Sequence, residues 1–81
     1  MVRVLLFGRL RDVAGWRERS FEPTPATVST LIAKLATEDP ALGEALAGKG
    51  VRFSIDKTLA SGDPELAGGM EIAFLPPMSG G

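Results

Sequence analysis

The stretch "ATVSTLIAKLATEDP", from Ala26 to Pro40, carries the clearest periodic signal in the chain. Its apolar residues recur every three or four positions and form one stripe along a helix: Val28, Leu31, Ile32, Leu35 and Ala36. Thr27 is placed to cap the start of this helix, and Asp39-Pro40 ends it because the residue before a proline avoids helical dihedrals. The stretch therefore predicts one amphipathic helix that needs an apolar surface to cover.

Extended segments precede this helix. "VRVLLF" (residues 2–7) is apolar on both faces except at Arg3, which predicts a central strand. Leu10, Val13 and Ala14 then favour a short helical turn that Gly15 ends. Residues 16–22 predict a second, more exposed strand.

Extended segments also follow the helix, after a further short helix over residues 42–46. "VRFSID" (51–56) and "MEIAFL" (70–75) alternate apolar and polar residues, which is typical of strands with one buried face. Between them, a brief extended piece is expected around Leu59. "SGDPELAGG" (61–69) reads as a turn-rich connector.

One main helix can cover only one face of such a sheet. The compact arrangement lays it across a mixed sheet with the first and last strands side by side, which is the α+β β-grasp, or ubiquitin-like, fold. We expect residues 1–75 to form this domain and residues 76–81 to leave it as an extended flexible tail. Leu59 and Leu75 are expected on the uncovered face, where a partner would gain about 1.5–3 kcal/mol by burying each side chain.

Composition excludes several classes of protein. The 81 residues allow one domain, and the chain contains neither cysteine nor histidine, so no disulfide, thiol nucleophile or imidazole base is available and no metal site is expected. Nine basic against ten acidic residues give no overall field that would attract nucleic acid or a membrane. No apolar run is long enough for a signal peptide or a membrane span, so the expected location is cytoplasmic.

Charge is nevertheless uneven along the sequence. The first twenty residues hold five arginines and two carboxylates, whereas residues 61–81 hold Asp63, Glu65 and Glu71 and no basic residue. Scattered surface charge is the simpler interpretation. A basic or mixed-charge partner at the C-terminal end is the alternative.

The final stretch, "FLPPMSGG" (74–81), ends almost without side chains. Pro76 and Pro77 favour a polyproline extension, and Ser79, Gly80 and Gly81 would fit a slot too narrow for a Cβ atom. The Gly81 carboxylate is a poor electrophile, but transfer to a nucleotide phosphate would make an acyl adenylate that a nucleophile attacks. The tail therefore indicates a substrate of an activating enzyme, with a frayed terminus or an expression scar as the simpler alternative.

The chain resembles the MoaD/ThiS sulfur carriers over essentially its whole length. Two segments carry the resemblance: "VRVLLFGRLRDVAG" (2–15) is similar to that family's opening strand and turn, and "GGMEIAFLPPMSGG" (68–81) is similar to its closing strand and tail. The Pro-Pro pair before Gly-Gly is similar to the MoaD branch, the small subunits of molybdopterin synthases. The resemblance implies a sulfur carrier in molybdenum cofactor biosynthesis. An E1-like adenylyltransferase would adenylate Gly81 with ATP and Mg²⁺, a sulfur donor protein would convert it to a thiocarboxylate, and that sulfur would pass to the pterin precursor.

The resemblance also implies partners. This chain would be the non-catalytic, sulfur-donating subunit in a heterotetramer of two large and two small subunits, and it would bind no cofactor itself. The tail residues Pro76, Pro77, Ser79 and Gly80 would insert into the partner, and Arg11, Leu59 and Leu75 match the patch that family members press against it. Leu75 stands where an aromatic residue is frequent.

Three other functions stay open at this point. The chain is alternatively a carrier for thiamine or cysteine synthesis, a ubiquitin-like modifier joined through Gly81 to lysines, or a passive interaction domain with an idle tail.

Overall fold

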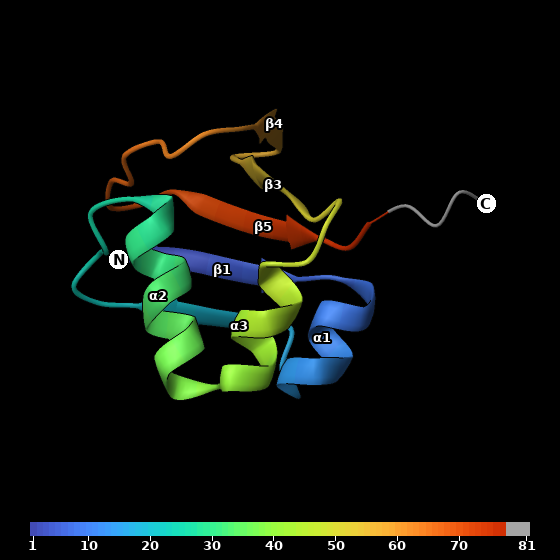
Figure 1. Ribbon diagram of the computed structural model, residues 1–81. Coiled ribbons are helices and arrows are strands. Elements are labelled where there is room, and N and C mark those ends of the chain that lie inside the picture. The colour runs from blue at the N-terminus through green and yellow to red at the C-terminus, as the bar shows by residue number, and fades with distance from the viewer. Residues whose placement is uncertain (78–81) are drawn as a thin grey trace.

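The computed structural model describes residues 1–77; the predictions for residues 78–81 lie outside the described part of the chain. A five-stranded mixed sheet in the order β2-β1-β5-β3-β4 carries its helices on one face (Figure 1). The elements in chain order are β1 (Val2–Leu6), α1 (Gly8–Ala14), β2 (Glu18–Phe21), α2 (Val28–Glu38), α3 (Pro40–Leu46), β3 (Arg52–Ile55), β4 (Thr58–Ala60) and β5 (Glu71–Leu75).

The first and last strands lie side by side and run parallel, as the β-grasp prediction requires. Val4 pairs with Ile72, and Leu6 pairs with Phe74. These four side chains are at most 2% exposed, so both strands contribute to the core between sheet and helices. The predicted α+β fold is therefore confirmed, with β5 flanked by β1 on one side and β3 on the other.

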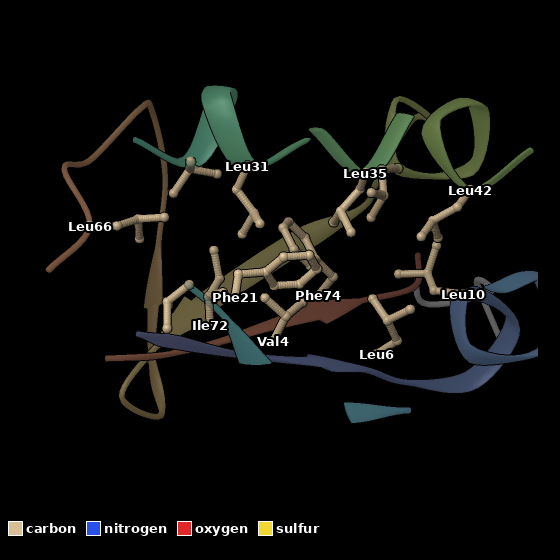
Figure 2. Close-up of a cluster of buried hydrophobic side chains, with 13 residues drawn as sticks. Val4, Leu6, Leu10, Phe21, Leu31, Leu35, Leu42, Leu66, Ile72 and Phe74 are labelled. Carbon is tan, nitrogen blue, oxygen red and sulfur yellow. The ribbon is translucent and has the colours of Figure 1, made fainter. Parts of the chain in front are cut away.

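The amphipathic helix supplies the opposite wall of the core. Val28, Leu31 and Leu35 of α2 are buried and point toward the sheet, where Figure 2 shows Leu31 and Leu35 above Phe21 and Phe74. The Thr27 side chain accepts a hydrogen bond from the Thr30 N–H at 3.2 Å, which confirms the predicted cap.

The second strand is shorter than expected because Trp16 lies before it rather than in it. The guanidinium of Arg19 stacks 5.2 Å from the Trp16 ring and 4.7 Å from the Phe21 ring. Arg19 Nη1 also donates to Glu38 Oε1 at 3.0 Å, so this arginine ties β2 to the end of α2.

The short third helix starts as soon as α2 ends. Asp39 is both the C-cap residue of α2 and the N-cap residue of α3. Its side chain accepts a hydrogen bond from the Leu42 N–H at 3.2 Å in the first turn of α3. Among residues 1–77, no helix is both long enough and apolar enough to cross a bilayer.

Candidate functional site

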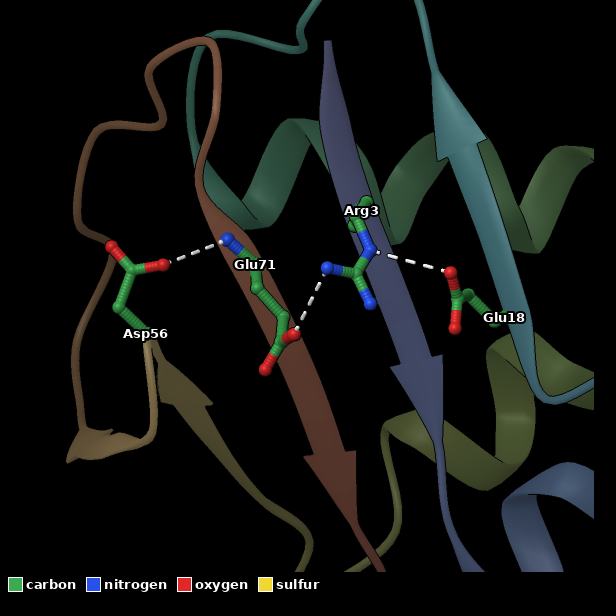
Figure 3. Close-up of polar contacts among 4 residues, drawn as sticks. All are labelled: Arg3, Glu18, Asp56 and Glu71. Carbon is green, nitrogen blue, oxygen red and sulfur yellow. Dashed lines mark hydrogen bonds and ion pairs between the residues drawn. The ribbon is translucent and has the colours of Figure 1, made fainter.

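The sheet face opposite the helices is charged where β1 and β5 begin. Arg3 Nε lies 3.3 Å from Glu18 Oε2, and Arg3 Nη1 lies 3.5 Å from Glu71 Oε1 (Figure 3). The Asp56 carboxylate accepts a hydrogen bond from the Glu71 N–H at 3.0 Å. The exposed ion pairs contribute little stability on their own, but they make this half of the face polar.

The same face becomes apolar toward the other end of these strands. We call this region the open-face patch; it consists of Leu5, Phe7, Leu59, Ala73 and Leu75. The strand register places Leu5, Ala73, Ser54 and Leu59 in one line across β1, β5, β3 and β4, all projecting away from the helices. Leu59 is 61% exposed and Phe7 is 46% exposed, whereas Leu5 and Leu75 are half-buried and Ala73 is buried, so Leu59 and Phe7 supply most of the apolar surface that the helices leave uncovered.

Two glycines hold the base of the tail. A Cβ atom on Gly8 would lie 2.9 Å from Pro76 Cγ, and one on Gly50 would lie 2.8 Å from Pro77 Cβ. Gly8 and Gly50 also have φ angles of +54° and +88°, which side-chain-bearing residues rarely adopt. The two prolines therefore pack directly against glycine backbone, and we call this contact the glycine seat.

The glycine seat lies in a groove between the helices and the end of the sheet. Besides Pro76 and Pro77, the groove is lined by residues of α1, α3 and the loop that follows α3: Arg9, Leu10, Ala45, Gly48, Lys49 and Val51. Chain segments remote in sequence thus fix the point at which the tail leaves the domain.

The predicted partner residues Arg11, Leu59 and Leu75 come from three separate elements. Leu75 lies on β5 and Leu59 on β4, and β3 separates them. Arg11 is exposed on α1, where it lines hollows shared with Phe7, Leu5 and Arg17. The predictions for Ser79, Gly80 and Gly81 fall outside the described residues.

Sequence reasoning missed Gly8, Gly50 and Phe7. The sequence predicts Phe7 in the first strand, but β1 ends at Leu6, and the extended backbone of Phe7 places its ring on the open face. For Gly8 and Gly50 the sequence offers no local signal, because their contacts are with prolines far along the chain.

Two features of residues 1–77 bear on whether the domain could bind a metal ion or supply an acid or base: the arrangement of potential metal ligands and the environment of Asp63. No group of three or more histidine, cysteine, aspartate or glutamate side chains within residues 1–77 is arranged to hold a metal ion. Within residues 1–77, hydrogen bonds from the Ser29 N–H and hydroxyl, both 2.7 Å, hold the pKa of Asp63 below its usual value. Asp63 packs against the start of α2, away from the open-face patch, so its carboxylate has a structural role.

Known proteins resemble this chain over its whole length. The model of the ThiS family matches residues 4–81. The chain is 31% identical over 81 residues to the Molybdopterin synthase sulfur carrier subunit of Escherichia coli (strain K12), and the alignment covers 100% of both proteins.

Solved structures show the same fold. A putative molybdopterin converting factor, subunit 1, from Pyrococcus furiosus superposes with a TM-score of 0.79 at 30% identity, covering 95% of this chain and 97% of that one. The small archaeal modifier protein 1 of H. volcanii superposes with a TM-score of 0.81 at 25% identity, with the same coverage.

Proposed function

Because the chain belongs to the ThiS family, we propose that it serves as the sulfur carrier subunit of a molybdopterin synthase. The observation that carries the proposal is the full-length match, through Gly81, to a protein named for that role. Two features of the described domain support it: the glycine seat holds the base of the tail, and the open-face patch beside it is free to dock.

The proposed chemistry takes place on the tail. The Gly81 carboxylate attacks the α-phosphorus of ATP on an E1-like adenylyltransferase that uses Mg²⁺, and pyrophosphate leaves. A donor protein would then deliver sulfur at the sulfide level; its C–S bond forms at the carbonyl carbon as the C–O bond to AMP breaks, which leaves a thiocarboxylate at Gly81 and free AMP. This carrier contributes no acid, base or metal ligand to these steps; it presents its terminus to enzymes that do.

The proposed docking surface is the open-face patch, pressed against the large synthase subunit in a heterotetramer of two large and two small subunits. Residues 78–81 span at most about 14 Å when extended. The reacting centre of any partner must therefore lie within about 14 Å of the residue at position 77. Docking against the adjacent sheet face meets this requirement, because Leu75 on that face directly precedes Pro76.

Mass spectrometry of the intact protein tests the proposal. The chain is co-expressed with the adenylyltransferase and the sulfur donor, and we expect a mass increase equal to the replacement of one oxygen by sulfur, mapped to Gly81. A variant lacking Gly81 is the control and should show no increase. An unmodified terminus in preparations that support synthase activity would contradict the proposal.

A ubiquitin-like modifier is the second candidate, favoured by the similarity to the small archaeal modifier protein 1. It predicts higher-mass conjugates, linked through lysine, that disappear when Gly81 is deleted. A carrier for thiamine or cysteine synthesis would instead be recognised by the large partner that co-purifies with it.

A further inference from the structure

Basic side chains gather at the end of the domain where the tail leaves. They come from four separate places: α1, the residue before β2, the loop after α3 and the start of β3. We call them the basic collar, and they are Arg9, Arg11, Arg17, Lys49 and Arg52. Arg9 and Lys49 line the groove around Pro76 and Pro77, Arg11 and Arg17 line the hollow beside Leu5 and Phe7, and Arg52 pairs with Leu75 in the register.

Most of the collar lacks a carboxylate partner. Within residues 1–77, the only collar ion pair is Arg11 Nε to Asp12 Oδ1 at 3.9 Å, between two exposed side chains. Two other carboxylates lie nearby: Glu18 is paired with Arg3, and Glu44 shares a hollow with Arg9. The collar therefore keeps an excess of positive charge at its surface.

The opposite end of the domain is acidic. Its carboxylates are Glu22, Asp56, Asp63, Glu65 and Glu71, against which stand Lys57, the paired Arg3 and the α-amino group of Met1 beside Gly68. Contacts fix this end in space: Glu65 bridges to Thr27 beside the start of α2, and the Asp56 N–H donates to the Glu71 carbonyl at the start of β5. The carboxylates of residues 61–81 thus lie far from the tail, because β5 carries the chain back across the sheet.

Salt screens the charge of the acidic end from a protein that approaches the basic collar. From Glu71 to Pro76 the extended strand covers about 17 Å. That is about twice the Debye length of 8 Å at physiological ionic strength. A protein approaching the tail therefore meets the positive collar rather than the formal net charge of −1.

We infer that the basic collar steers the carrier, tail first, onto an acidic rim around the slot of its protein partner. This inference rests on the proposed function and adds the charge of the partner surface and the direction of approach. The collar residues lie around the tail base and do not converge on one deep pocket, so they suit a broad acidic protein surface better than a small phosphate-bearing ligand.

Association kinetics with the large synthase subunit test the inference, with two charge reversals that change net charge equally. Lys49→Glu acts in the collar, and Lys57→Glu acts at the acidic end. At low salt we expect Lys49→Glu to slow association by about fivefold or more with dissociation little changed, and the difference should vanish at high salt. Lys57→Glu should leave the association rate within about twofold of the parent.

The outcomes distinguish electrostatic steering by the basic collar from the proposed carrier function. Equal effects of both substitutions, an association rate independent of salt, or faster association of Lys49→Glu would overturn steering while leaving the carrier function intact. Competition by inorganic triphosphate at matched ionic strength, with no salt effect on partner association, would assign the collar to a phosphate ligand and likewise refute the inference. Absence of binding at every salt concentration would refute the carrier function together with it.

Discussion

Leu59→Ala should separate docking from folding. Leu59 lies on the edge strand β4 and is 61% exposed, so a partner covering the open-face patch would bury that remaining surface. Complete burial of a leucine side chain is worth about 1.5–3 kcal/mol, so burying this fraction is worth about 0.9–1.8 kcal/mol. The dissociation constant for the large synthase subunit should rise by about five- to twentyfold.

Calorimetric titration measures this affinity, and urea unfolding measures the stability of the same variant. We expect the free energy of unfolding to change by less than about 0.5 kcal/mol, because the replaced side chain makes few contacts in the free domain. Thr58→Ala is the matched control: Thr58 is exposed on the same strand but projects toward the other face. Its substitution should leave the affinity unchanged.

Two results would refute this reasoning. An unchanged affinity of Leu59→Ala would mean that the partner does not cover the open-face patch. An equal loss of affinity in Thr58→Ala would mean that disturbance of the edge strand, rather than burial of leucine, controls binding.

The remaining predictions concern the core, the tail base and pH. Phe74→Ala removes a ring that is 1% exposed and should lower the free energy of unfolding by about 3–5 kcal/mol in urea titration; a loss below 1 kcal/mol would show that the core does not depend on it. Gly8→Ala and Gly69→Ala both place a side chain at positive φ, and each should lower the free energy of unfolding by about 1–2 kcal/mol. Only Gly8→Ala displaces Pro76, so only this variant should bind the partner more weakly in calorimetric titration. Equal losses of affinity in the two variants would reject the glycine seat. The Ser29 hydrogen bonds lower the folded-state pKa of Asp63, so its stabilising contribution is present above the unfolded pKa of about 3.9 and is lost as the pH falls through the folded value. Asp63→Asn should therefore flatten the acid limb of the stability profile measured by thermal denaturation, and an unchanged limb would exclude this effect.

Local patterns in the sequence predicted the elements and the core well. The three- and four-residue spacing from Val28 to Ala36 identified the α2 face that meets the sheet, and the alternation in residues 70–75 separated buried Phe74 from outward Leu75. Both signals depend on neighbours along the chain, which is why they could be seen without a structure.

Features that depend on distant segments could not be predicted in the same way. The glycine seat requires Gly8 and Gly50 to meet two prolines across the end of the sheet. The linear charge pattern was misleading for the same reason: the acidic residues near the C-terminus suggested a basic partner there. The fold places them at the opposite end from the tail, so they do not support that hypothesis.

The central position of β5 also determines how the carrier resists mechanical load. A partner that grips the tail pulls on a strand whose backbone is hydrogen-bonded to β1 on one edge and β3 on the other. Force along the strand loads both ladders in shear, so many bonds must break together before the strand slides. We therefore expect a pull along β5 to be resisted by both neighbouring strands at once.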